Sequence, residues 1–195
     1  MPAPPSPELV VVLGAESTGK TTLARALAER LAEPYVEEAG RTLWEERGGD
    51  LPLADYVEIV RRHLALEEEA LRRARRFVVV DTNALTTQYY AYVFHRACPP
   101  EVRAAADRCR ARYAHVLVCD PDVPFEADGW RASEDARRFM DGAVRNDLAV
   151  RGIPYRAVGG AVEARVEAAL RAIGAAPPTQ AAPTPSGRRP GGTGR

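Results

Sequence analysis

The chain has 195 residues, of which 46% are hydrophobic, and its 27 basic side chains are balanced by 27 acidic ones, so the formal net charge is zero. This length suffices for one sizeable core but not for two full domains. Zero net charge argues against a general binder of nucleic acid or another polyanion. No stretch approaches the roughly 20 apolar residues of a membrane span, and residues 1–5 lack the features of a signal peptide. We therefore expect a cytoplasmic protein that contacts neither membrane nor nucleic acid.

Short apolar runs alternate with helical patterns in the middle of the chain, between two terminal segments of biased amino-acid composition. This alternation predicts an α/β domain over residues 8–174, with a five-stranded, mostly parallel sheet and helices on both faces. Residues 1–7 are rich in Pro and residues 175–195 in Pro, Gly and Ala, so we expect both to be disordered. The expected strands are 9–13, 35–36, 77–80, 116–119 and 155–158. The expected helices are about 21–32, 39–47, 53–75, 84–96, 100–112, 134–151 and 161–173.

A phosphate-binding loop follows the first expected strand and precedes an Ala- and Leu-rich helix. Residues 14–21 spell the complete pattern G-x-x-x-x-G-K-[ST], and Lys20 within it is the only lysine of the chain. In a chain whose other basic residues are all arginine, a retained lysine indicates a site that a planar guanidinium cannot serve. The pattern predicts a P-loop NTPase whose loop binds ATP. The expected nucleotide-binding residues are Gly14, Ala15, Glu16, Ser17, Thr18, Gly19, Lys20, Thr21 and Thr22.

Carboxylates and an arginine follow the second expected strand. Glu38 is placed to accept a proton from a substrate hydroxyl, and Arg41 lies within one helical turn to orient it or to contact substrate. An acidic helix start that complements the helix dipole explains the same residues equally well. Several aromatic residues flank this presumed site, and one or two of them are suited to stack on a planar ring. They are Trp44, Tyr56, Tyr89, Tyr90 and Tyr92, of which we select Trp44 and Tyr56 as substrate-binding.

The third expected strand ends in a carboxylate. Residues 77–81 read Phe-Val-Val-Val-Asp, the form of a Walker-B strand, which would bring Asp81 to the edge of the sheet beside the phosphate loop. There Asp81 and the Thr21 hydroxyl would hold Mg²⁺, directly or through water. A helix cap is the competing interpretation of Asp81.

An irregular segment with a glycine and one prominent arginine follows the fourth expected strand. Residues 124–131 read Pro-Phe-Glu-Ala-Asp-Gly-Trp-Arg, and a mobile loop of this kind suits a kinase lid in which Arg131 neutralises charge during phosphoryl transfer. A plain surface loop remains the alternative.

Together these segments resemble the ribosylnicotinamide kinase domain of the NadR family. The resemblance spans about residues 8–173 and rests on residues 14–22, 38–41, 81–88, 121–124 and 128–131. It implies a P-loop kinase, grouped with AAA-type ATPase domains, that uses ATP to phosphorylate the 5′-hydroxyl of nicotinamide riboside. One departure is Asn83, where the family often has a second Asp after Asp81. Another is the lack of the fused adenylyltransferase and DNA-binding domains that family members carry, so the kinase alone is expected.

Three other functions for a P-loop chain differ in plausibility. A regulatory GTPase normally reads guanine with an Asn-Lys-x-Asp motif, which cannot exist here because the sole lysine is in the phosphate loop. An oligomeric AAA motor needs a separate helical lid domain for which the chain is too short. A kinase of another small molecule, such as a nucleoside or nucleotide, is the serious rival because P-loop kinases share their catalytic machinery. The sequence therefore predicts a phosphotransferase that needs ATP and Mg²⁺. Its expected catalytic residues are Lys20, Glu38, Asp81 and Arg131.

Overall fold

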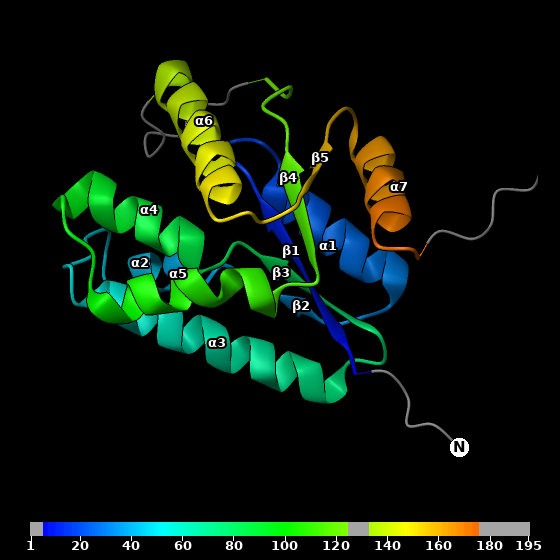
Figure 1. Cartoon of the computed structure of the whole chain (residues 1–195), viewed down its shortest axis with the longest axis horizontal. Coiled ribbons are helices and arrows are strands. Elements are labelled where there is room, and N and C mark those ends of the chain that lie inside the picture. Colours follow the sequence, from blue (N-terminus) through cyan, green and yellow to red (C-terminus); the bar gives the residue numbers. More distant parts are fainter. Residues whose placement is uncertain (1–5, 125–132, 176–195) are drawn as a thin grey trace, which may run out of the picture.

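A computed structural model describes residues 6–124 and 133–175 of the chain, and Figure 1 shows their arrangement. Five strands form one sheet in the order β2-β3-β1-β4-β5, and each neighbouring pair within the described residues is parallel. The predicted sheet is thus confirmed, including the short second strand. The strands are β1 Glu8–Leu13, β2 Tyr35–Val36, β3 Phe77–Asp81, β4 His115–Cys119 and β5 Arg156–Val158.

The helices cover both faces of this sheet. In Figure 1, α1 and α7 lie on one side, and the larger group of helices lies on the other. Each predicted helix is present with its bounds shifted by at most two residues. The helices are α1 Lys20–Leu31, α2 Ala39–Glu46, α3 Asp55–Arg73, α4 Ala84–His95, α5 Pro100–Arg112, α6 Glu134–Val150 and α7 Val162–Ala172.

Strand β1 runs through the centre of the sheet and is buried on both faces. Val10 and Val12 pack with α1 and α7, while Val11 and Leu13 point into the cluster beneath the other helices. Successive side chains of a strand point to opposite faces, so a strand covered on both sides must be apolar throughout. This explains why residues 9–13 form a continuous apolar run rather than an alternating one.

The topology brings several loops to one edge of the sheet. From β1 the chain passes through α1 to β2 on one side of the sheet, and after β3 it crosses to β4 on the other side of β1. A ligand site in such a sheet lies outside the carboxyl ends of the strands, where the strand order reverses. Val12 of β1 is in register with Asp81 of β3. The phosphate loop and the predicted metal carboxylate are therefore neighbours.

Part of the predicted organisation falls outside the described residues. Residues 1–5, 125–132 and 176–195 are not described, so most of both predicted tails and the predicted lid arginine, Arg131, lie there. The domain boundaries at 8 and 174 remain predictions. Over residues 6–124 and 133–175, no helix combines the length and the apolar character that crossing a membrane demands.

Candidate active site

Glycines determine the path of the phosphate loop between β1 and α1. Gly14 has φ +143°, and a Cβ there would lie 3.0 Å from the backbone oxygen of Cys119 and 2.9 Å from Thr18 Oγ1. Gly19, directly before α1, has φ +78°, a left-handed conformation that side chains rarely adopt. Both glycines of the sequence pattern are thus required by the backbone, and the loop delivers its amides to the N-terminus of α1.

Two polar side chains of the loop are bonded to the loop's own backbone. Lys20 Nζ donates to the Ala15 carbonyl at 2.7 Å, and Thr18 Oγ1 donates to the same oxygen at 2.8 Å. Ala15 and Thr18 are fully buried, whereas Lys20 is partly exposed to the cavity described below. The ammonium is therefore held at the loop with donors left for a phosphate, since a lysine carries three.

Asp81 and Thr21 meet beside the loop. Thr21 Oγ1 donates to Asp81 Oδ2 at 2.6 Å, and the Tyr35 hydroxyl donates to the same oxygen at 3.3 Å. Burial and the Asp81 carboxylate raise the pKa of Tyr35 to about 12, which keeps it a donor. Asp81 is fully buried, and its other oxygen, Oδ1, has no hydrogen-bond partner. An unpartnered buried carboxylate oxygen next to a hydroxyl fits a hard divalent cation such as Mg²⁺.

The helix cap after β3 is supplied by Asn83 rather than by Asp81. Asn83 is the N-cap residue of α4, and its Oδ1 accepts a hydrogen bond from the Leu85 amide at 3.0 Å. A neutral amide serves this role as well as a carboxylate does. The departure from the family pattern at this position therefore has a structural explanation, and Asp81 is left for the site.

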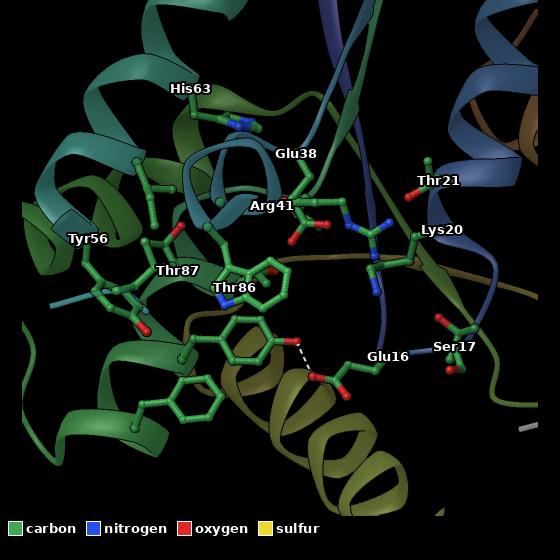
Figure 2. Close-up of a pocket in the computed structure, with 18 of the residues that line it drawn as sticks. Glu16, Ser17, Lys20, Thr21, Glu38, Arg41, Tyr56, His63, Thr86 and Thr87 are labelled. Carbon is green, nitrogen blue, oxygen red and sulfur yellow. Dashed lines mark hydrogen bonds between the residues drawn. The ribbon is translucent and has the colours of Figure 1, made fainter. Parts of the chain in front are cut away.

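A single cavity of about 350 Å³ extends from the phosphate loop to α4. Figure 2 shows the side chains around it, with Glu38 and Arg41 reaching from α2 toward Lys20. One end of the cavity is formed by polar loop residues and the other by aromatic and apolar side chains of α2, α3 and α4. The lining residues are Glu16, Ser17, Thr18, Gly19, Lys20, Thr21, Thr22, Glu38, Gly40, Arg41, Trp44, Leu51, Tyr56, Ile59, His63, Thr82, Thr86, Thr87, Tyr90 and Phe94.

Glu38 stands at the junction of these two ends. It occupies the N-cap position of α2 but makes no side-chain capping hydrogen bond. Its pKa is raised above the ordinary value, chiefly because burial disfavours the carboxylate and secondarily because Asp81 repels it, while Lys20 and Arg41 oppose the shift. A carboxyl group with a raised pKa next to a phosphate site has the properties of a general base. The alternative interpretation, an acidic helix start that complements the helix dipole, needs no capping hydrogen bond and stays open, because Glu38 lies at the N-terminus of α2.

The far end of the cavity is an aromatic wall. Tyr90 stacks on Phe94 with ring centroids 5.7 Å apart and planes inclined by 9°, and the Tyr90 hydroxyl donates to Glu16 Oε1 at 2.8 Å. Trp44 and Tyr56 complete the lining from α2 and α3. Because Glu16 belongs to the phosphate loop, its bond to Tyr90 ties the two ends of the cavity together.

The structure brings most of the predicted residues together, with two qualifications. Gly14, Ala15 and Asp81 lie beneath the surface of the cavity rather than on its lining. Tyr89 and Tyr92 do not line the cavity, because both line a separate apolar groove between α4 and α6, although the Tyr89 ring contacts that of Tyr90. Their neighbour Tyr90 faces the cavity, because successive residues of a helix point in directions about 100° apart.

Several residues of the cavity lining were not predicted from the sequence. His63 lines the cavity from α3, and its Nε2 lies 3.4 Å from the buried carboxylate of Glu67 one turn later. Its position seven residues after Tyr56, on the same helical face, was the available signal. Phe94, four residues after Tyr90, follows the same rule. Thr86 and Thr87 also line the cavity and carry no comparable pattern.

Comparison with known proteins places this site in a family. Residues 9–165 match the model of the AAA domain family AAA_28. The chain belongs to this family. It is also 31% identical over 139 residues to the trifunctional NAD biosynthesis/regulator protein NadR of Escherichia coli K12, and equally so to that of Salmonella typhimurium LT2. The match covers 68% of this chain and 33% of each relative, so the chain spans about a third of their length.

Solved structures confirm the fold. A NadR protein in complex with NR superposes with a TM-score of 0.71 at 24% identity, covering 87% of this chain and 52% of that one. A NadR protein in complex with NAD and AMP-PNP gives 0.69 at 23% identity, covering 87% and 50%. Thymidylate kinase from Ehrlichia chaffeensis gives 0.59 at 16% identity, covering 87% and 98%. The predicted kinase-type P-loop fold and the resemblance to NadR are both confirmed.

Proposed function

We propose that this domain is an ATP-dependent kinase that phosphorylates the 5′-hydroxyl of nicotinamide riboside to give nicotinamide mononucleotide. The observation that carries the proposal is the continuous cavity, which joins a complete phosphate loop to an aromatic chamber through the carboxylate of Glu38. A kinase needs these parts side by side, because the acceptor hydroxyl must lie in line with the transferred phosphorus and its leaving oxygen, with a proton acceptor within hydrogen-bond reach of the hydroxyl.

The residues of the phosphate loop hold the donor. The loop amides and the Lys20 ammonium bind the β- and γ-phosphates as hydrogen-bond donors and as a point charge. Thr21 and Asp81 are the residues that would hold Mg²⁺, and the Asp81 oxygen without a partner is the feature that fits it. When bound, the ion neutralises negative charge on the phosphates. ATP as donor agrees with the AMP-PNP bound by the related NadR protein.

Glu38 and the aromatic wall serve the acceptor. Glu38 orients the attacking hydroxyl and accepts its proton, and Arg41 is positioned to steady the bound substrate. The rings of Trp44, Tyr56 and Tyr90 suit a planar cation, because a pyridinium gains about 0.5–2 kcal/mol on an aromatic face. The NR bound by a related NadR protein supports the same acceptor.

Two parts of the proposal rest on the sequence alone. Arg131 is assigned to neutralise charge during transfer, and it lies outside the described residues. A cytoplasmic site of action is the second such part of the proposal.

A coupled assay of ADP release tests the proposal directly. Purified protein with MgATP is screened against nicotinamide riboside, adenosine, cytidine, uridine and the nucleoside monophosphates, and specificity constants are compared. We expect nicotinamide riboside to be preferred by at least about tenfold over each neutral nucleoside, the equivalent of one strong cation–π contact. Preference for a nucleoside or a nucleoside monophosphate would assign the domain to the rival class of small-molecule kinases.

A further inference from the structure

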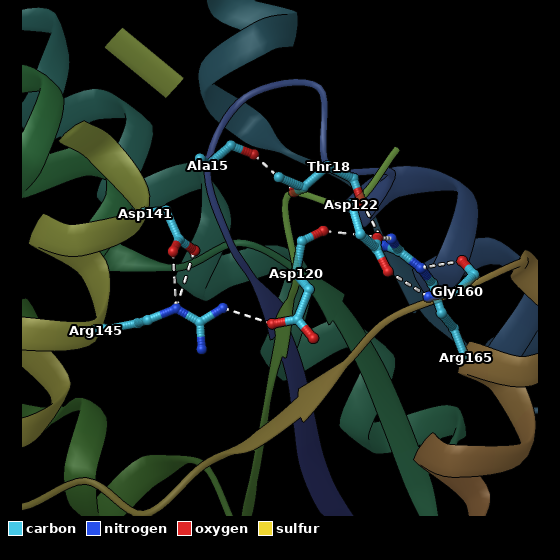
Figure 3. Close-up of polar contacts among 8 residues, drawn as sticks. All are labelled: Ala15, Thr18, Asp120, Asp122, Asp141, Arg145, Gly160 and Arg165. Atoms are coloured by element: carbon cyan, nitrogen blue, oxygen red, sulfur yellow. Dashed lines mark hydrogen bonds and ion pairs between the residues drawn. The ribbon is translucent and has the colours of Figure 1, made fainter. Parts of the chain in front are cut away.

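A fully buried arginine lies behind the phosphate loop, outside the cavity. Arg165 belongs to the first turn of α7 and is 2% exposed. Its Nη1 donates to the Thr18 carbonyl at 2.5 Å and its Nε to the Gly160 carbonyl at 2.8 Å. Its Nη2 donates to the Asp120 carbonyl at 3.3 Å and pairs with Asp122 Oδ1 (Figure 3). Four contacts thus converge on one guanidinium.

These partners come from three segments that follow three different strands. Thr18 lies in the loop after β1, Asp120 and Asp122 follow β4, and Gly160 lies between β5 and α7. Asp122 strengthens the assembly, because its Oδ2 accepts a hydrogen bond from the Gly160 amide at 2.5 Å. All three segments leave the carboxyl edge of the sheet, where a nucleotide binds in this architecture.

The bond to Thr18 determines the orientation of the next peptide group. A peptide is planar and trans, so its carbonyl and its amide hydrogen point in opposite directions. Because Arg165 holds the Thr18 carbonyl, the Gly19 amide hydrogen points away from Arg165. Loop amides that face inward are what make an anion-binding nest.

The chemistry of the contacts calls for arginine. A guanidinium has five N–H groups in a rigid fork, so it can donate hydrogen bonds to three carbonyls and a carboxylate that lie in different directions. A lysine ammonium has three donors at one point and cannot reach them together. A purely stabilising role is a weaker explanation, because a buried ion pair adds little stability compared with apolar side chains of similar size.

We propose that Arg165 is a positioning residue for the nucleotide: it orients the Thr18–Gly19 peptide toward the phosphates and holds the segment between β5 and α7 against the phosphate loop. The inference rests on the proposed use of ATP. It assigns no contact between Arg165 and the reacting atoms, so its loss acts on the binding of MgATP and not on the binding of the acceptor.

The test compares variants that disturb this cluster in two ways. Arg165→Met and Arg165→Lys remove the fork. Gly159→Ala leaves Arg165 in place but disturbs its partner, because a Cβ at position 159 would lie 2.6 Å from Asp122 Oδ2. Arg151→Met is the matched control for the arginine, since Arg151 pairs with Asp107 and Asp147 away from the cavity. Gly142→Ala is the control for the glycine, since a Cβ there meets nothing within 4 Å.

We measure the Kd for MgATP by titration, the KM for MgATP and for the acceptor, and Tm without ligand. Arg165→Met and Arg165→Lys should raise the Kd and KM for MgATP by about 10- to 100-fold and Gly159→Ala by about three- to tenfold, as expected for misaligned donors to charged phosphates. In these three variants the KM for the acceptor should stay within about twofold of the wild type. In both control variants the Kd for MgATP and both KM values should do the same.

Equal losses for MgATP and acceptor, or unchanged MgATP binding in folded variants, would overturn the inference. If Arg165→Met does not fold, Arg165→Lys and Gly159→Ala decide the question by the same criteria. A wild-type protein that binds MgATP but does not phosphorylate nicotinamide riboside would refute the proposed acceptor and leave this test valid. A wild-type protein that does not bind MgATP would refute both.

Discussion

The two ends of the cavity are built in different ways. The phosphate end is made by one continuous loop, in which backbone amides, two glycines and Lys20 lie within eight residues of one another. The acceptor end is assembled from three successive helices, with Glu38 at the N-cap of α2, Tyr56 on α3 and Tyr90 on α4. The phosphate end depends on local backbone conformation, and the acceptor end depends on how helices pack.

This difference explains why the two ends should respond differently to substitution. Triphosphate geometry is the same for every acceptor, so damage to the phosphate loop should affect all reactions alike. In the proposed function the helical side chains serve the acceptor, so changes there should alter selectivity and turnover without loss of the nucleotide.

The largest effect is expected from Lys20→Arg. Charge is kept, but the planar fork is too bulky for a loop in which Lys20 Nζ lies 2.7 Å from the Ala15 carbonyl, so transfer should fall by at least about 100-fold. Turnover and MgATP binding provide the measurement. Arg30→Lys, a charge-conserving change on the exposed side of α1 near Glu167, is the control and should change neither. Activity of Lys20→Arg within about threefold of the wild type would break the assignment.

An intermediate effect is expected from pH, and it concerns the acceptor end. Because burial raises the pKa of Glu38, the group stays protonated to higher pH than an exposed glutamate. A base must be deprotonated, so kcat/KM for the acceptor should fall about tenfold per pH unit below a midpoint that lies above the ordinary glutamate value.

The same shift predicts the direction of the stability change. The folded state holds the Glu38 proton more tightly than the unfolded state does, so this contribution to stability is present at low pH and is lost as pH rises through the folded-state pKa. Glu38→Gln should abolish both the acid limb of the pH–rate profile and this pH-dependent contribution to stability. An unchanged acid limb in Glu38→Gln would assign the limb to another group.

The smallest effect is expected from Tyr90→Phe. This variant distinguishes the role of the Tyr90 hydroxyl, which links the two ends of the cavity, from the role of its aromatic ring. The variant loses the hydrogen bond to Glu16 at 2.8 Å but keeps the ring that stacks on Phe94. We expect a loss of about 1–2 kcal/mol, or roughly five- to thirtyfold in kcat/KM, typical of a hydrogen bond to a charged group. Tyr92→Phe on the same helix lies outside the cavity and is the control. Equal kinetics of the two variants would show that the link has no role.

The sequence was sufficient for the fold because its signals are local and repeated. Apolar runs, helical periodicity and the phosphate loop predicted the strands, the helices and the neighbourhood of Thr21 and Asp81. The G-x-x-x-x-G-K-[ST] pattern predicts the phosphate loop reliably because its glycines are required by the backbone conformation, such as the φ of +143° at Gly14. Glu38 and Arg41 were found because they follow a strand directly.

The residues that were missed act through contacts between distant segments. His63 and Phe94 needed a helix face to be placed toward the cavity, which periodicity alone leaves open. Arg165 contacts Thr18 across 147 positions of sequence, and in a chain whose basic residues other than Lys20 are all arginine nothing distinguishes it. The buried position of an arginine is set by tertiary packing and leaves no local pattern.

The most direct test of the division into two ends is a paired measurement on Asp81→Asn and Glu38→Gln. For both variants MgATP is titrated and transfer is followed in a single turnover, with hydrolysis to water measured alongside. Asp81→Asn should weaken metal–nucleotide binding and damage transfer to every acceptor, water included, whereas Glu38→Gln should keep MgATP binding and lose about 10²- to 10⁴-fold in transfer. Loss of MgATP binding in Glu38→Gln together with its retention in Asp81→Asn would contradict the account.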